Sequence, residues 1–281
     1  VAFANLLPPA IYGNYKYILS LVGTLGIFAL IGMRTAVSQA VARGLEGSFY
    51  SGFKTQLKWG VLGSLAALGG AAYYWWQGNY ALTVPLMMTA VFLPLLYASR
   101  IYTGFLGGKK LFDVLTKYSI YTQIISSAAI IGLLFLTKNL FWLVAAYFIF
   151  NTFLNYFFYL LTKFKFRPNK KEDEKTLNFA KHLSLIEVVS VVSSYLDKVL
   201  LFTWVGSIQL AVYSFAILLP EQIKNIVESL NTLAFPKLAQ KSQEEIRANM
   251  IKKVWKLVFL TGTIIVLYAI ISPYFFKIFF P

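Results

Sequence analysis

The chain has 281 residues, of which 58% are hydrophobic and only 13% are charged. A soluble domain carries about twice that share of charged residues, and disordered chains lack so many aromatic residues, so the composition indicates a protein whose solvent is lipid. The absence of cysteine excludes disulfides and thiolate sites. A single histidine, His182, disfavours histidine-based metal binding or catalysis, and we expect neither a metal nor a cofactor.

Long apolar runs follow one another along the chain. A membrane-spanning helix needs about 20 mostly apolar residues, and the runs predict eight complete spans, at 15–33, 57–76, 80–99, 118–137, 139–162, 182–203, 207–230 and 253–272. Continuous runs of this length predict helices rather than alternating strands. The chain also begins and ends inside apolar stretches, Val1–Ala4 and Tyr274–Pro281, which we interpret as partial spans of a longer protein.

The connections between these runs carry the net charge of +15. Most of the 26 lysines and arginines lie in alternate connections, and this asymmetry predicts that those connections face the cytoplasm. The lipid bilayer therefore explains the basic residues, and we expect no nucleic acid as a partner. Within the run at 57–76, small residues share one face and predict close helix contact: Gly60, Gly63, Ser64, Ala67 and Ala71.

One strongly polar stretch, Lys163–Lys175 (KFKFRPNKKEDEK), separates the earlier spans from the later ones. It contains Pro168 and charges of both signs, which is typical of a solvated, flexible linker. We therefore divide the chain into an N-terminal helical bundle over 1–162, a cytoplasmic linker over 163–177 and the start of a C-terminal bundle over 178–281.

The predicted span at 182–203 contains ionisable residues. Five polar residues follow one another at helical spacing, which predicts one polar face: Ser184, Glu187, Ser190, Ser194 and Asp197. An ionised carboxylate at bilayer depth costs about 2.5–3.5 kcal/mol on insertion scales, so Glu187 and Asp197 should face a protein interior or a water-filled lumen. Lys198 can reach a carboxylate or the bilayer interface. The alternative to a transport lumen is a buried ion pair that holds helices together.

Pro220 interrupts the next predicted span, and Glu221 and Lys224 follow it at helical spacing. A broken, polar helix in a membrane usually lines a cavity, which makes both residues lumen candidates. The alternative is an amphipathic helix end that emerges into the cytoplasm.

Arg34 directly follows the span at 15–33. Its guanidinium can bind a phosphate through two parallel hydrogen bonds, so Arg34 is a candidate for substrate contact. The alternative is a positive anchor at the cytoplasmic membrane surface. Nothing in the chain predicts catalysis: no glycine-rich nucleotide loop is present, and we expect a protein that is not an enzyme.

Two stretches carry a family resemblance. In the first, Tyr12-Gly13 and Tyr15 form a Tyr-Gly-x-Tyr pattern ahead of a span that ends in small residues, although Leu7-Pro8-Pro9-Ala10 departs from the family's turn. In the second, four short motifs match in order: Asp197-Lys198, Gly206, Ala211-Val212-Tyr213 and Pro236-Lys237. The chain resembles the polysaccharide transporters, including O-antigen flippases, of the multidrug/oligosaccharidyl-lipid/polysaccharide exporter superfamily.

This resemblance implies two six-helix bundles around a central cavity, with the chain running from the end of helix 1 to the start of helix 10. It implies a flippase of the bacterial inner membrane that moves undecaprenyl-diphosphate-linked oligosaccharides by alternating access, for lipopolysaccharide or other surface polysaccharides. Protons or sodium ions could couple transport to a lumen carboxylate. The candidate lumen residues, chosen above from their positions and chemistry, are Arg34, Glu187, Asp197, Lys198, Glu221 and Lys224.

Three alternatives remain at this point. The nearest is a cation-coupled multidrug exporter of the same superfamily, with an acidic and aromatic lumen. A membrane-embedded glycosyl- or acyltransferase would carry carboxylates or histidines in its extramembrane loops, and the predicted outer loops contain none. A membrane scaffold without transport activity would tolerate neutral replacements of Glu187 and Asp197.

Overall fold

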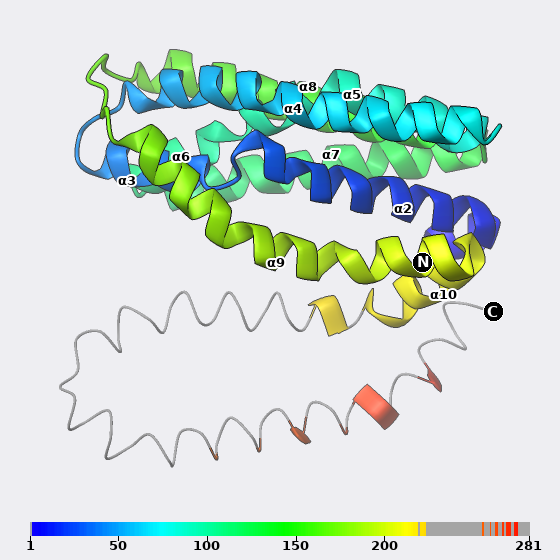
Figure 1. The fold of residues 1–281 in the computed structure, drawn as a ribbon. Helices are drawn as coiled ribbons and strands as arrows, with labels where there is room; N and C mark the ends of the chain where they lie inside the picture. Colours follow the sequence, from blue (N-terminus) through cyan, green and yellow to red (C-terminus); the bar gives the residue numbers. More distant parts are fainter. Residues whose placement is uncertain are drawn as a thin grey trace. The chain divides into compact units, whose positions relative to one another are not determined.

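A computed structural model of the chain describes residues 2–218, 220–222 and isolated positions between 255 and 274. The described residues form helices and the turns between them, and none of them lies in a strand (Figure 1). The all-helical prediction is therefore confirmed for this part of the chain. Residues Leu6–Ala211 form one compact unit, and Val1–Asn5 group with Val212–Pro281 in another.

The helices follow one another in this order: α1 (Ala2–Leu6), α2 (Pro9–Leu25), the 3-10 helix η1 (Gly26–Ala29), α3 (Met33–Ala42), α4 (Ser48–Trp76), α5 (Tyr80–Ser99), α6 (Ile101–Gly108), α7 (Phe112–Leu136), α8 (Leu140–Phe166), α9 (Thr176–Val205) and α10 (Ser207–Ala216). Their ends follow local rules. Pro9 opens α2, where a missing backbone N–H costs nothing. Asn139 caps α8 by accepting a hydrogen bond from the Phe141 N–H at 2.9 Å.

Within the described residues, three helical stretches are long and apolar enough to cross a membrane: Tyr80–Gly108, Phe112–Leu136 and Leu140–Phe166. A fourth candidate is the bent pair Pro9–Ala29 and Met33–Ala42. These four stretches contain or overlap the predicted spans at 80–99, 118–137, 139–162 and 15–33.

Helices also form over the predicted spans at 57–76 and 182–203, within α4 and α9, but neither helix is among these candidate membrane spans. The predicted span at 207–230 is described only as far as residue 222, and most of the span at 253–272 lies outside the described residues. The count of eight spans therefore stays a prediction, and so do the central cavity and the two-bundle division with its boundary at 163–177.

The helices of the Leu6–Ala211 unit pack in a chain of neighbours. The hairpin of α4 and α5 packs along its length, α5 also packs on α8, and α8 packs on α7 (Figure 1). The small-residue face of α4 makes the predicted contact with α5, since a Cβ on Gly60 would lie 2.8 Å from the Cα of Pro94. The helix α9 packs on α2 and α3, and α3 packs on α6.

The polar linker is solvated, as predicted, but it is fastened rather than free. Its residues 168–176 contact the loop 43–48, and we call this contact, together with Lys109, the linker clasp. Arg43 pairs with Asp173, and Lys109 pairs with Glu46. The Asn169 N–H donates to Glu46 Oε2 at 2.9 Å, and the Gly47 N–H donates to the Lys171 carbonyl at 2.8 Å. The expectation of a flexible linker missed this contact because its partners lie more than 100 residues earlier.

Candidate functional site

The candidate site begins at a break in a predicted span. The helix α2 continues into η1, Leu30 then takes a left-handed φ of 52°, and α3 starts at Met33 after a bend of 50°. The predicted span at 15–33 therefore contains a break that the sequence analysis did not anticipate. This break places Arg34 in the first turn of α3, directly after the bend.

Side chains from two other helices satisfy the backbone at this break. Gln56 Nε2 of α4 donates to the carbonyls of Ala29 and Leu30, both at 3.2 Å. Ser184 Oγ of α9 accepts from the Gly32 N–H at 3.1 Å and donates to the Ala180 carbonyl at 2.7 Å. Irregular backbone is tolerated at membrane depth only where protein or water replaces the lost hydrogen bonds, so these contacts hold the bend in place.

Two glycines fix α3 between its neighbours. A Cβ on Gly32 would lie 2.6 Å from the Cβ of Leu183, so α9 passes directly over this glycine. A Cβ on Gly104 would lie 2.3 Å from the Arg34 carbonyl, so α6 touches the α3 backbone. Small residues allow such close approach between helices in membranes. As a result Arg34 lies where α3, α6 and α9 meet.

Arg34 and Glu187 line one pocket of about 320 Å³. The hydroxyl residues Thr35, Ser38 and Thr103 also line it. This volume is at the lower end of the range of about 300–1,000 Å³ for ligand pockets. The pocket therefore combines a guanidinium, a carboxylate and hydroxyl groups, which can bind an anionic or hydroxylated group.

Neither Arg34 nor Glu187 forms an ion pair with another residue in the part of the chain that the structure describes. Arg34 interacts electrostatically with Arg100 and with Glu187, without a direct contact to either. Ionisable groups at membrane depth are costly and are typical of functional sites. The arrangement leaves the Arg34 guanidinium available to a ligand.

A second, apolar pocket of about 290 Å³ lies at the same helix break. Leu30, Trp59, Ser184 and Leu185 are among its lining residues. Lys181 Nζ lies 5.7 Å from the Trp59 ring centroid, within the range of a cation–π contact. The break therefore separates a polar pocket from an apolar one, and both include residues of α9.

A comparison with known protein families assigns this chain to a family. The model for polysaccharide biosynthesis proteins matches residues 2–281. The chain belongs to the polysaccharide biosynthesis protein family. No curated protein and no solved structure matches it significantly. The family confirms the resemblance to polysaccharide transporters. With the apolar helices it identifies a membrane protein with a role in polysaccharide synthesis or transport.

In this polysaccharide biosynthesis protein, the pocket contains two of the six predicted lumen residues, Arg34 and Glu187. Asp197 lies ten residues beyond Glu187 on α9, about 15 Å along the helix axis, and is exposed outside the pocket. Asp197 is therefore not part of this pocket, and its role in a lumen stays a prediction.

Of the three other predicted lumen residues, Lys198 belongs to the same unit and is not among the residues that line the pocket. Lys198 is partly buried, and its Nζ lies 5.8 Å from the Tyr195 ring centroid. Glu221 is partly buried in the unit that contains Val212–Pro281. Lys224 lies outside the described residues, so its role stays a prediction.

Sequence reasoning missed several groups around this pocket. Gln56 went unrecognised, although it lies one turn before Gly60 on the small-residue face of α4, where a buried amide needs a partner. Thr35 and Ser38 were also missed, and for Ser38 the signal is the spacing of four residues that puts it beside Arg34 on α3. No sequence signal indicates that Arg100 comes within electrostatic range of Arg34.

Proposed function

We propose that this polysaccharide biosynthesis protein is a flippase, and not an enzyme, that translocates lipid-linked oligosaccharides across the bacterial inner membrane. Its substrate is an undecaprenyl-diphosphate-linked unit for surface polysaccharide, and it works by alternating access. One observation carries the proposal: Arg34, a cation without an ion-pair partner among the described residues, lines a hydroxyl-containing pocket beside a broken helix.

The chemistry of the pocket suits the junction between the diphosphate and the first sugar. The planar guanidinium of Arg34 can donate two parallel hydrogen bonds to phosphate oxygens. The hydroxyls of Thr35, Ser38 and Thr103 can exchange hydrogen bonds with a sugar. The volume of about 320 Å³ fits this junction rather than a whole oligosaccharide. The apolar pocket at the break would take the first part of the isoprenoid chain.

Glu187 is the carboxylate best placed to couple transport to protons or sodium. It lines the same pocket as Arg34, so its charge opposes the binding of an anionic diphosphate. Binding of a proton or a sodium ion would remove that repulsion and favour the loaded pocket. Asp197 is the second candidate for this coupling, at a different level of α9.

The role of the Arg34 pocket in substrate binding is tested by measuring surface polysaccharide together with the lipid-linked precursor in each leaflet of the inner membrane. The full-length protein, or its variants, would be produced in a bacterial strain that lacks its own copy, with immunoblots to confirm equal membrane levels. Arg34→Gln should reduce surface polysaccharide at least about tenfold, because charged hydrogen bonds contribute about 1.5–3 kcal/mol. Lipid-linked precursor should accumulate in the inner leaflet.

Two matched variants make this result specific. Arg34→Lys keeps the charge but loses the planar fork, so it should retain partial output. Arg43→Gln removes an arginine of the linker clasp, nine residues away, and should leave output within about twofold, since exposed ion pairs contribute little. Normal output from Arg34→Gln would rule out the substrate role of this pocket.

A cation-coupled multidrug exporter is the competing function, and the Glu187 carboxylate is the observation that favours it. Such an exporter would raise resistance to organic cations, and Arg34→Gln would strengthen that effect by removing a repulsive charge. Resistance assays on the same strains separate the two functions.

The coupling role is tested with Glu187→Gln and Asp197→Asn. If Glu187 couples transport to protons, its variant should lose the pH dependence of precursor translocation, and Asp197→Asn should keep it. The reverse result would move the role to Asp197. Unchanged profiles for both variants would exclude both carboxylates.

A further inference from the structure

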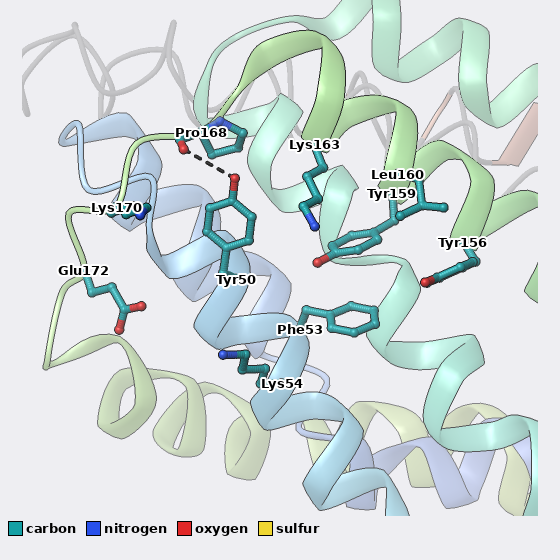
Figure 2. A pocket seen from close by; sticks show the side chains of 10 residues that line it. All are labelled: Tyr50, Phe53, Lys54, Tyr156, Tyr159, Leu160, Lys163, Pro168, Lys170 and Glu172. Atoms are coloured by element: carbon teal, nitrogen blue, oxygen red, sulfur yellow. Dashed lines mark hydrogen bonds between the residues drawn. The ribbon is translucent and has the colours of Figure 1, made fainter.

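A larger pocket of about 690 Å³ lies between α4, α8 and the linker (Figure 2). It shares no lining residue with the Arg34 pocket. Its walls come from α4, α8 and the linker. The basic residues in the connections predict that this end of the bundle faces the cytoplasm. This pocket has no part in the proposed function.

An aromatic wall closes one side of this pocket. The rings of Phe53 and Tyr159 stack at a centroid distance of 4.3 Å, and Tyr156 stacks on Tyr159 at 6.0 Å. The Tyr156 and Tyr159 hydroxyls have no hydrogen-bond partner within the described residues. Stacked rings are held in place, so the wall offers a rigid apolar surface with hydroxyl groups at its edge.

Three lysines, one from each element, surround this wall. Lys54 comes from α4, Lys163 from α8 and Lys170 from the linker (Figure 2). None of the three forms an ion pair in the described part of the chain. Glu172 is the one acidic residue of the lining, so the charged groups carry a net charge of +2. An anion is therefore favoured over a cation here.

The linker forms the third wall and is fixed before any ligand binds. The Tyr50 hydroxyl donates to the Pro168 carbonyl at 3.4 Å, as Figure 2 shows. The linker clasp holds the residues that follow. The position of Lys170 is thus restrained, and the pocket is built before a ligand enters.

We propose that this pocket binds a phosphate-bearing headgroup at the cytoplasmic face, independently of the Arg34 pocket. Lysine ammonium groups bind phosphate as movable point charges. Tyrosine hydroxyls can bond the hydroxyls of a headgroup, and tyrosine and lysine together are typical of the membrane interface. The favoured ligand is the phosphodiester of an anionic phospholipid, and a soluble phosphate ester is the other source of the same chemistry.

The test is native mass spectrometry of the full-length protein in detergent, with phosphatidylglycerol or phosphatidylethanolamine added. The protein should bind phosphatidylglycerol more tightly than phosphatidylethanolamine. The triple variant Lys54→Gln, Lys163→Gln and Lys170→Gln should weaken phosphatidylglycerol binding at least about tenfold. A triple Lys→Arg variant at the same positions should keep binding and would show that the fold is intact.

The matched control removes the same charge from exposed lysines outside the pocket, through Lys58→Gln, Lys117→Gln and Lys165→Gln. It should change binding less than about twofold, because these lysines do not line the pocket and act on its ligand only through screened, longer-range electrostatics. A parallel titration of delipidated protein with inorganic phosphate and glycerol phosphate shows whether the pocket takes a phospholipid or a soluble phosphate ester. Lysine-dependent binding of these probes alone would assign the pocket to a soluble ligand. Equal losses in both triple variants, or no lysine dependence with any probe, would overturn the proposal.

Discussion

The linker clasp and the Arg34 pocket handle charge in opposite ways. In the clasp, Glu46 and Asp173 each pair with a basic side chain, and backbone N–H groups bond to both carboxylates. In the pocket, Arg34 and Glu187 have no ion pair within the described residues. Charges that already have partners hold a structure together, whereas unpaired charges in a partly buried pocket are available to a ligand.

The titration behaviour of the clasp agrees with this difference. Burial raises the pKa of Glu46, but hydrogen bonds from Lys109 and from the Asn169 backbone outweigh it and bring the pKa below its ordinary value. The Lys175 backbone N–H and the Arg43 guanidinium likewise hold the pKa of Asp173 below its ordinary value. Both carboxylates are therefore stabilised in their ionised form at neutral pH.

The largest effect is expected at the helix break that builds the pocket. Gln56→Leu would remove the donor to the Ala29 and Leu30 carbonyls. The Leu30 carbonyl would keep its bond from the Met33 N–H, but the Ala29 carbonyl would lose its side-chain donor, and a buried acceptor left unsatisfied costs about 1–3 kcal/mol. The variant should unfold at a clearly lower temperature in detergent, and Arg34 should lose its position. Gln123→Leu, at an exposed glutamine of α7, should unfold within a degree or two of the unchanged protein. Equal behaviour of the two variants would show that Gln56 does not hold the break.

The next effect concerns the contact between α6 and α3. Gly104→Ala places a Cβ 2.3 Å from the Arg34 carbonyl, so the two helices must move apart. Overpacking of this kind typically costs about 1–3 kcal/mol. Gly69→Ala, on a face of α4 with nothing within 4 Å, should be neutral or slightly stabilising. Thermal unfolding of the two variants compares them directly, and a neutral Gly104→Ala would contradict the described packing.

A smaller effect on stability should distinguish the paired carboxylate of the linker clasp from the carboxylate of the Arg34 pocket. Glu46→Gln removes a paired charge of the clasp and should lower stability by up to about 1 kcal/mol. Glu187→Gln removes an unpaired charge and should leave stability unchanged or slightly higher. Unfolding midpoints measured side by side test this contrast. A larger loss for Glu187→Gln would mean that its charge has a structural partner.

The smallest effect is the response of the clasp to pH. Because folding lowers the pKa of Glu46 and Asp173, their contribution is fully present above the ordinary values of 4.5 and 3.8 and is lost as pH falls through the lowered values. Protection of linker amides against hydrogen exchange, corrected for intrinsic rates, should be constant from neutral pH down to about 5. It should fall only in more acidic solution, and a loss near pH 6–7 would point to a different titrating group.

The sequence predicted the parts of this fold that depend on local pattern. Uncharged runs identified the helices α5, α7 and α8, and the small-residue face of α4 predicted its contact with α5. Glu187 was identified as a candidate lumen residue because charge is costly in a bilayer, and Arg34 because a guanidinium directly after a span can bind phosphate. Nothing in the local sequence indicated that Arg34 and Glu187, which are 153 residues apart, would line the same pocket.

The remaining features depend on contacts between distant segments. The bend after Leu30 needs Gln56 and Ser184, which lie 26 and 152 residues from their partners at the break. The linker composition predicted flexibility, but the clasp is decided by Glu46 and Arg43 more than 100 residues earlier. Helical spacing placed Asp197 on one polar face with Glu187, but a separation of ten residues puts it about 15 Å along α9 and outside the pocket.

The most direct test of the central claim places a photoreactive amino acid in the full-length protein at Ser38, which lines the Arg34 pocket, or at the exposed neighbouring residue Gln39. Membranes that contain radiolabelled undecaprenyl-diphosphate-linked oligosaccharide are then irradiated. We expect labelled adducts at position 38, their loss when Arg34→Gln is added, and little labelling at position 39. Equal labelling at both positions, or labelling at 38 that does not depend on Arg34, would contradict the claim that this pocket binds the lipid-linked substrate.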